Sequence, residues 1–467
     1  MLKRFQLNYQ IPCTAYFQQV RSLGNAVLLD SGYPNCKRGR FDIISAAPIA
    51  TITYHQGELS AKNLPFSHTA DSDPFAVLTQ LKESVKQQLS SLQFADQRLE
   101  SPPFCGGFLG HFSYDLGRSI EVLPNIAKDD LSLPEMQLGL YTWAIISDHQ
   151  LAITYLVGSE LISSADFTEL STLIATTKHL APPLQSASKF QLNTPFSSNM
   201  DAAYYANALT KIDQYILNGD CYQVNFAQRF SAQCQGDPLQ AYLTLREAAP
   251  THFSAFIDTP NGAVLSLSPE RFLKVDRQGS VITQPIKGTQ PRAEDLQQDQ
   301  ANKDFLINSE KDQAENLMIV DLMRNDISKS CALHSVKVPS LFAVESYQNV
   351  HHLVSTVTGK LEENADAIEL LRNCFPGGSI TGAPKIRAMQ IIDELEPHRR
   401  SIYCGSIGYL SLCGSMDTSI TIRTLLIENN NIYCWAGGGI VADSEINAEY
   451  QETFDKVNNL LNALQDQ

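Results

Sequence analysis

Four glutamates have the residue type and the spacing of a metal site. Glu445, Glu449 and Glu452 lie at positions i, i+4 and i+7 of a predicted helix, so their carboxylates share one face. Glu315 precedes the apolar stretch 317–323 of a second predicted helix, where burying a carboxylate without a partner is costly. If the two faces meet, their oxygen atoms suit Mg²⁺. A solvated acidic face and a salt bridge at the start of a core helix are the alternatives.

A glycine-rich turn at 376–385, Pro-Gly-Gly-Ser-Ile-Thr-Gly-Ala-Pro-Lys, is a candidate anion site. Pro384 suits the first position of the helix that follows, and the turn exposes backbone N–H groups beside that helix start. The turn lacks the Gly-Lys-Ser/Thr ending of a nucleotide-binding loop, so a carboxylate is at least as suitable a ligand as a phosphate. Arg423, in the alternating stretch 419–427, could bind a carboxylate through two hydrogen bonds or form a structural ion pair.

Glu270 and Lys287 are candidates for acid and nucleophile. Glu270 follows a predicted strand in Ser-Pro-Glu-Arg-Phe at 268–272, and Lys287 stands 17 positions later in Pro-Ile-Lys-Gly-Thr at 285–289. A carboxylic acid can protonate a leaving group, and a neutral lysine can attack an electrophilic carbon. Glu270 beside Arg271 is by default a surface ion pair.

Predicted helices and strands must bring these residues together. Tyr205, Leu209, Ile212 and Ile216 step by 4, 3 and 4, which predicts an amphipathic helix. An apolar stripe from Ile446 to Leu464 predicts another, after the glycines at 437–439. The stretches 222–230, 263–268, 271–275 and 281–286 alternate as strands and come in hairpin-like groups. This order favours an α+β fold with antiparallel sheets flanked by helices.

Composition divides the chain and limits its partners. The Pro- and Ser-rich stretch 181–200 predicts a linker between an α+β domain at 1–180 and a second domain at 201–460. The net charge of −15 argues against nucleic acid or an anionic membrane surface as the partner. No run reaches about 18 apolar residues, so we expect a cytoplasmic protein. The ten cysteines form no C-x-x-C pair, and we expect reduced packing residues and no zinc site.

Taken together, seven stretches give the sequence a family resemblance. They are 219–225, 267–272, 285–289, 314–326, 350–357, 376–385 and 437–453. With them the chain resembles the chorismate-utilising enzymes over nearly its whole length. The resemblance implies two antiparallel sheets packed as a sandwich with flanking helices, and an active site in the cleft between the sheets.

The resemblance also implies roles for single residues. Glu315 and Glu449 would hold Mg²⁺, with Glu452 close by. His352 would lie near a ring hydroxyl of chorismate, although a lone histidine beside an apolar strand is otherwise core packing. The remaining substrate contacts would come from Thr381, Gly382, Arg423, Gly438, Gly439 and Lys456.

Two positions distinguish the branches of the family. Isochorismate and salicylate synthases resemble this chain but place a lysine base where it has Gln223, and anthranilate synthases place a small alanine where it has Lys287. The resemblance therefore implies an amino-group transferase that makes 4-amino-4-deoxychorismate for 4-aminobenzoate and folate. Lys287 would attack C2 while Glu270 protonates the C4 hydroxyl. The alternatives are the large subunit of anthranilate synthase and a non-catalytic ligand-sensing subunit.

The resemblance implies two further binding partners. Ammonia would come from a separate glutamine amidotransferase subunit, because no glutaminase stretch is visible in the chain. The segment 28–32 is similar to one that lines a tryptophan pocket in the family, although Asp30 departs from the usual Glu. Ordinary strand and turn packing is the alternative. The candidate tryptophan contacts are Ser31, Arg38, Gly39, Arg40, Phe41, His252, Phe253 and Ser254.

Overall fold

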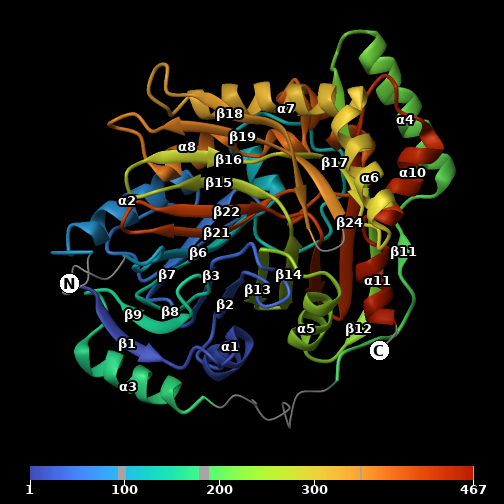
Figure 1. The fold of residues 1–467 in the computed structure, drawn as a ribbon. Coiled ribbons are helices and arrows are strands. Elements are labelled where there is room, and N and C mark those ends of the chain that lie inside the picture. The colour runs from blue at the N-terminus through green and yellow to red at the C-terminus, as the bar shows by residue number, and fades with distance from the viewer. Residues whose placement is uncertain (93–100, 178–188, 348–349, 466–467) are drawn as a thin grey trace.

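Two large antiparallel sheets form the centre of the computed structural model, which describes residues 1–92, 101–177, 189–347 and 350–465 (Figure 1). The first sheet has 13 strands and the second has 11. A continuous apolar cluster with residues from both sheets, such as Phe108, Leu109, Val264 and Leu426, fills the space between them. The predicted α+β fold with two packed antiparallel sheets is confirmed.

The first sheet contains strands from both ends of the chain. Its path is β1-β9-β8-β3-β2-β13-β14-β23-β24-β12-β10, and β11 and β20 also pair with β12. The bounds are β1 (Lys3–Leu7), β2 (Val27–Asp30), β3 (Phe41–Ser45), β8 (Trp143–Asp148), β9 (Ile153–Gly158), β10 (Gln191–Leu192), β11 (Ser197–Ser198), β12 (Gln223–Gln235), β13 (Phe253–Thr259), β14 (Gly262–Ser268), β20 (Gly382–Ala383), β23 (Thr424–Glu428) and β24 (Asn431–Ile440).

The second sheet is built the same way. Its path is β17-β19-β16-β15-β22-β21-β6-β7-β4-β5, and β18 also pairs with β19. The bounds are β4 (Ala50–His55), β5 (Glu58–Lys62), β6 (Gly107–Phe112), β7 (Met136–Tyr141), β15 (Arg271–Val275), β16 (Ser280–Thr283), β17 (Ile286–Pro291), β18 (Lys337–Ser346), β19 (Val350–Lys360), β21 (Ser406–Ser411) and β22 (Met416–Ile420).

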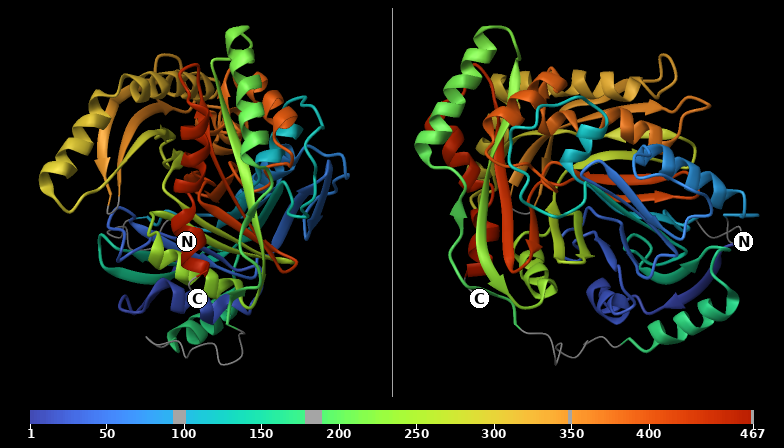
Figure 2. Two further views of the ribbon diagram at one scale, coloured as in Figure 1. Left: turned by 90° about the vertical axis from the view of Figure 1, so that its right-hand side faces the viewer. Right: turned by 180° about the vertical axis from the view of Figure 1, so that it is seen from behind.

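Helices cover the outer faces of the sheets. α6 and α7 lie over β17 and β19, whereas α9 packs on β12 and α10 on β24 (Figure 2). The bounds are α1 (Cys13–Arg21), α2 (Pro74–Lys86), α3 (Ser164–Ala175), α4 (Ala202–Leu217), α5 (Pro238–Ala248), α6 (Leu296–Asn308), α7 (Glu310–Ser328), α8 (Ala367–Cys374), α9 (Lys385–Leu395), α10 (Ile446–Asp455) and α11 (Asn458–Gln465), with 3₁₀ turns η1 (Tyr114–Ser119) and η2 (Gly378–Ile380).

The two expected domains share both sheets. Strand β2 pairs with β13, and β6 pairs with β21, so residues before and after the expected linker lie on neighbouring strands. The division into 1–180 and 201–460 therefore stays a prediction from composition. Part of the expected linker lies outside the described residues, and two short pieces of the rest, β10 and β11, pair with β12.

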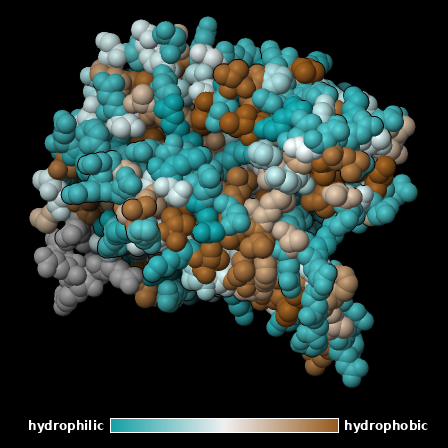
Figure 3. Space-filling model, turned by 90° about the horizontal axis from the view of Figure 1, so that it is seen from above, coloured by the Kyte–Doolittle hydropathy of each residue, from teal (hydrophilic) through white to brown (hydrophobic). Residues whose placement is uncertain are grey.

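The surface is that of an ordinary globular protein. The face in Figure 3 mixes hydrophilic residues with separate groups of hydrophobic ones. Large exposed apolar side chains include Leu296 and Phe305 on α6 and Leu317 on α7. Within the described residues, no helix combines the length and the apolar character needed to span a membrane.

Candidate active site

The predicted site residues gather where β12 and β24 of the first sheet meet β17 and α7 (Figure 1). Lys287 lies on β17 and Glu315 on α7, and their Nζ and Oε1 atoms are 2.8 Å apart. Gln223, at the start of β12, donates from Nε2 to the same Glu315 oxygen at 2.6 Å. Glu315 thus forms the salt bridge that the sequence analysis considered as an alternative to a metal site. Its partner in this salt bridge is Lys287, the candidate nucleophile.

The surroundings of Glu315 keep it ionised. Burial by itself would raise the pKa of this carboxyl, but the charges of Lys287 and Lys456 and the hydrogen bond from Gln223 outweigh it. The pKa of Glu315 therefore lies below its usual value. Gln223 is fully buried, and its Oε1 atom has no hydrogen-bond partner within the described residues.

Glycines on β24 make room for two carboxylates. A Cβ atom at Gly439 would overlap Gln223 Nε2 and lie 2.5 Å from Glu315 Oε1. A Cβ atom at Gly438 would lie 3.0 Å from Glu449 Oε2. Both carboxylates thus approach the backbone of one glycine pair, which explains why the chain has glycine at these positions.

The carboxylates of α10 differ in exposure. Glu449 is buried, accepts a hydrogen bond from Ser444 Oγ at 2.7 Å and lies 3.5 Å from Lys311 Nζ. Burial, with the charge of Glu452 nearby, raises the pKa of Glu449. Glu452 is exposed and pairs with Lys456 at 2.6 Å. Glu445 is exposed and precedes α10 as its N-cap residue, so the predicted helical face of three carboxylates is reduced to two.

These donors fit a hard cation without forming a closed cage. Glu315 and Glu449 supply carboxylate oxygens, and the glycine pair leaves open backbone beside them. Within the described residues, the only three candidate ligand atoms that all lie within 4.8 Å of one another belong to Cys13, Asp30 and Asp42. The expected metal residues thus have the chemistry for Mg²⁺, but Glu315, Glu449 and Glu452 do not form such a group of three.

Glu270 has the environment of a general acid. It follows β14, is 4% exposed, and accepts a hydrogen bond from Ser379 Oγ at 2.7 Å. Burial raises the pKa of Glu270 to about 7, and the Ser379 hydrogen bond and the Lys287 charge only partly offset this effect. The alternative of a surface pair with Arg271 is wrong, because Glu270 is buried and Arg271 pairs with Asp417 at 2.9 Å.

His352 is held as a neutral ring. It lies on β19, opposite Thr289 on β17, and its Nδ1 atom is 2.8 Å from Thr289 Oγ1. Burial, reinforced by the nearby charge of Arg423, lowers the pKa of His352 to about 3. A neutral imidazole can donate a hydrogen bond to, or accept one from, a substrate hydroxyl.

Arg423 is a buried cation whose side chain has no hydrogen-bond or ion-pair partner among the described residues. It precedes β23 with φ of +50°, and burial lowers the pKa of its guanidinium. Among the described residues, no carboxylate or other acceptor bonds to its guanidinium nitrogens. The structural ion pair considered from the sequence is therefore not formed there, and the guanidinium is available to an anion.

The glycine-rich turn is fixed by buried polar contacts. Thr381 is fully buried, and its hydroxyl donates to Gly377 O at 3.1 Å, while Gly382 pairs with Val224 of β12. Arg400, 1% exposed, donates to Ile380 O at 2.9 Å and pairs with Glu396. Because the Thr381 hydroxyl is already bonded within the turn, a ligand would contact the backbone of the turn more than this hydroxyl. Pro384 is the N-cap of α9 and not its first residue.

Sequence reasoning missed two residues of the site. Ser379 bonds to Glu270, and Lys311 lies beside Glu449. Ser379 belongs to the glycine-rich turn 376–385, so the sequence places it near the site. The sequence does not show that its partner is Glu270. Lys311 is the second residue of α7, one turn before Glu315.

A separate cavity of about 310 Å³ lies between the sheets. Arg271, Tyr409 and Asp417 form part of its wall. Ser31 does not line it, because its hydroxyl donates to Asp42 at 2.6 Å. The other seven candidate tryptophan contacts all line it, namely Arg38, Gly39, Arg40, Phe41, His252, Phe253 and Ser254.

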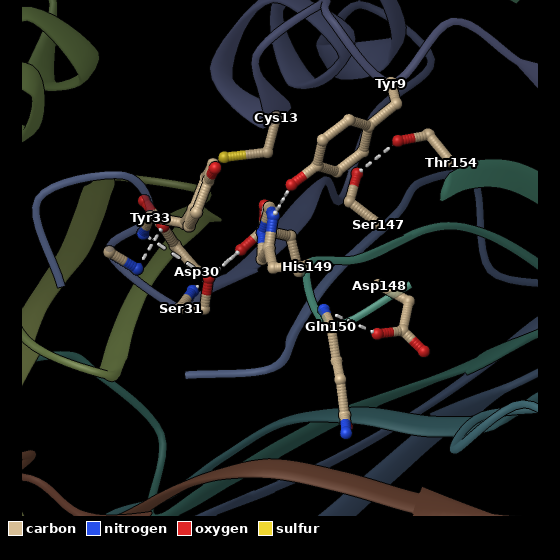
Figure 4. Close-up of polar contacts among 12 residues, drawn as sticks. Tyr9, Cys13, Asp30, Ser31, Tyr33, Ser147, Asp148, His149, Gln150 and Thr154 are labelled. Atoms are coloured by element: carbon tan, nitrogen blue, oxygen red, sulfur yellow. Dashed lines mark hydrogen bonds and ion pairs between the residues drawn. The ribbon is translucent and has the colours of Figure 1, made fainter. Parts of the chain in front are cut away.

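A buried polar cluster stands beyond one wall of this cavity. The ligand atoms of Cys13, Asp30 and Asp42 lie within 4.8 Å of one another. Figure 4 shows this region, with the Tyr9 hydroxyl 3.0 Å from His149 Nδ1. The carboxylates are already engaged: Asp30 accepts from Arg246 Nη2 at 3.1 Å, and Asp42 lies 2.8 Å from His149 Nε2. These ion pairs make the cluster a structural network that joins β2, β3 and α5.

Comparison with known proteins agrees with this geometry. The family described as chorismate binding enzyme matches residues 25–462. Aminodeoxychorismate synthase component 1 of Escherichia coli (strain K12) is 49% identical over 450 residues, covering 96% of this chain and 95% of that protein. Anthranilate synthase component 1 of Thermus thermophilus is 34% identical, covering 99% and 97%.

A solved structure extends the agreement to the fold. The crystal structure of anthranilate synthase component I from Streptococcus pneumoniae TIGR4 superposes with a TM-score of 0.78 at 31% identity. The match covers 91% of this chain and 92% of that one. The chain belongs to the chorismate-binding enzyme family.

Proposed function

We propose that this chain transfers an amino group to chorismate, forming 4-amino-4-deoxychorismate. The observation that carries the proposal is Lys287, a half-buried amine 2.8 Å from Glu315 in the candidate site. Relatives that are 48–49% identical over 450 residues bear the name aminodeoxychorismate synthase component 1, whereas the anthranilate synthases are 33–34% identical.

The chemistry follows from three side chains. The Lys287 amine, once neutral, attacks C2 of the ring, and Glu270 protonates the hydroxyl that leaves C4 as water. Attack at C2 shifts both ring double bonds as the C4 hydroxyl leaves. Ammonia then attacks C4, both double bonds shift back, and the lysine nitrogen leaves C2 and takes up the proton that the attacking ammonia loses. Arg423, which pairs with no carboxylate in the described part of the chain, binds a carboxylate of the substrate, and neutral His352 hydrogen bonds to a hydroxyl.

Mg²⁺ completes this proposal as a cofactor. Glu315 and Glu449 would hold the ion, with Glu452 at the exposed side, and the bound ion supplies positive charge to a substrate carboxylate. The glycine pair at 438–439 supports this assignment because it leaves space for both carboxylates. Lys456, which donates to Gly437 O at 2.9 Å, is placed to contact the substrate at the same edge.

Two further ligands belong to the proposal. Ammonia comes from a glutamine amidotransferase subunit, as the words "component 1" in the relatives' names support. Tryptophan occupies the cavity of about 310 Å³, whose size is that of a small-ligand pocket. Calorimetric titration of chain unfolded and refolded without tryptophan should show binding heat, and no heat would contradict this occupant.

Replacing Lys287 tests the covalent route. Lys287→Ala should abolish aminodeoxychorismate formation, and any residual product should be anthranilate, because the smaller side chain lets ammonia reach C2. Lys287→Arg is the matched control that retains the charge beside Glu315 without a nucleophilic amine, and it should also be inactive. Unchanged turnover to aminodeoxychorismate in either variant, measured by mass spectrometry, would contradict the route.

A further inference from the structure

Cys105 and Cys413 lie at the end of a strand pair, and neither belongs to the candidate site described above. β6 pairs with β21 in antiparallel register, with Gly107 opposite Ser411. Leu412 N donates to Gly106 O at 2.9 Å, which continues the pairing by one position. The next position in this register brings Cys105 opposite Cys413.

The register favours a bond between the two thiols. Leu412 and Gly106 are joined by a backbone hydrogen bond, and in a regular antiparallel ladder the pair after such a position is of the non-hydrogen-bonded kind, with Cα atoms about 4.5 Å apart. That separation is within the range of about 4.4–6.8 Å found across disulfides. Each thiol also shifts the pKa of the other, raising that of Cys105 and lowering that of Cys413, as neighbouring sulfurs do. The paired strand ends therefore bring the two cysteines close to each other.

The surroundings of the pair activate one sulfur. Cys413 Sγ donates to Ser411 Oγ at 3.2 Å and lies 3.0 Å from Ser415 Oγ. Arg277, in the turn between β15 and β16, places Nη2 2.8 Å from Cys105 Sγ. The hydrogen bond from Cys105, together with the Arg277 charge, lowers the pKa of Cys413 to about 5 despite burial.

Exposure separates the roles of the two cysteines. Of the ten cysteines, nine are buried, and Cys413 alone is half-exposed. Reactive cysteines are those that combine thiolate character with access to solvent. Cys413 has both, whereas Cys105 is fully buried directly behind it. This arrangement is that of an attacking thiol and a resolving thiol.

We propose that Cys105 and Cys413 are a redox modification site that forms a reversible intrachain disulfide. The Cys413 thiolate attacks one sulfur of a small-molecule disulfide such as glutathione disulfide and releases one thiolate. The Cys105 sulfur, losing its proton, then attacks Cys413 Sγ and expels the second thiol. One small-molecule disulfide is thereby reduced to two thiols, and the two cysteines are oxidised.

The disulfide would act on the β21–β22 hairpin. Cys413 lies in the turn of this hairpin, and Ile407, Tyr409 and Asp417 of the same hairpin line the cavity of about 310 Å³. Oxidation ties that turn to the start of β6. We expect the oxidised chain to melt at a higher temperature than the reduced chain, and dithiothreitol to reverse the shift.

Peptide mapping of the full chain tests the proposal. The chain is incubated with glutathione disulfide, alkylated in denaturant and digested. We expect eight alkylated cysteines instead of ten and one linked peptide pair containing Cys105 and Cys413, two hydrogens lighter than the reduced pair. A lasting glutathione adduct on Cys413 without the link, or no modification of Cys413, would overturn the proposal.

Single variants separate the two steps. Cys105→Ser should accumulate glutathione on Cys413, because the resolving sulfur is gone, whereas Cys413→Ser should acquire neither adduct nor link. Cys234→Ser removes a buried cysteine whose pKa burial raises to about 11 and is the matched control that should still form the link. Formation of the link at the wild-type rate by Arg277→Gln would contradict activation by Arg277.

Discussion

At the scale of residues, burial divides the carboxyl groups of the site into two kinds. Burial raises the pKa of Glu270 to about 7, whereas lysine charges and a glutamine hydrogen bond hold the pKa of Glu315 below its usual value. Environments that push two carboxyl pKa values apart are typical of an acid beside a charged ligand group. The pair therefore suits a reaction that needs one proton donor and one permanent anion.

A pH profile tests the role of Glu270. An acid with a pKa of about 7 is protonated below that pH, so kcat/KM for chorismate should fall as pH rises through 7, with free ammonia held constant. Ser379→Ala removes a hydrogen bond that favours the ionised form, so the fall should move upward by roughly half to one pH unit. An unmoved or downward-shifted profile would show that another group is the acid.

The residue types of the site were predictable, but their partners were not. The sequence offered Glu270 and Lys287 as acid and nucleophile, and both lie at the candidate site. It also offered a surface pair for Glu270, which burial excludes. Ser379 and Lys311 were missed because their contacts depend on how the glycine-rich turn and α7 pack, which local spacing does not encode.

At the scale of elements, the glycines of β24 determine how close α7 and α10 can place their carboxylates. The apolar spacing from Ile446 to Leu464 predicted one helix, but α10 ends at Asp455 and α11 begins at Asn458. The reason is tertiary: α10 packs on β24 and α11 packs on α5. The break leaves Glu449 on the short helix that faces the glycine pair.

Adding one methyl group to β24 should damage the site more than the fold. Gly439→Ala places Cβ against Gln223 and Glu315, so we expect activity to fall at least about a hundredfold, equivalent to about 2.7 kcal/mol. The control is Gly219→Ala, which meets no atom within 4 Å and has φ of +79°. It should cost about 1 kcal/mol of stability and leave kcat/KM unchanged. Full activity of Gly439→Ala would contradict the close approach of the carboxylates.

At the scale of the whole molecule, both halves of the chain are needed for either sheet. Alternation and hairpin grouping predicted antiparallel strands, because each pattern is local. They could not predict that β2 pairs with β13 or β6 with β21, since these partners are hundreds of residues apart. The composition seam at 181–200 predicted a boundary, yet the strands on either side of it share both sheets.

A truncated chain tests this shared architecture. A fragment of residues 201–467 would expose the edges of β13 and β21, which pair with β2 and β6 in the full chain. We expect it to aggregate or to lack a cooperative thermal transition, while the full chain melts cooperatively. A soluble fragment with a cooperative transition and a native near-UV spectrum would support the two-domain division instead.

The identity of the product tests the central claim most directly. The purified full chain is incubated with chorismate, Mg²⁺ and a high concentration of ammonium, with and without EDTA, and the product is analysed by mass spectrometry. The account predicts 4-amino-4-deoxychorismate, and its loss when EDTA removes the metal. Anthranilate as the product would contradict it, because Lys287 would then not direct the amino group to C4.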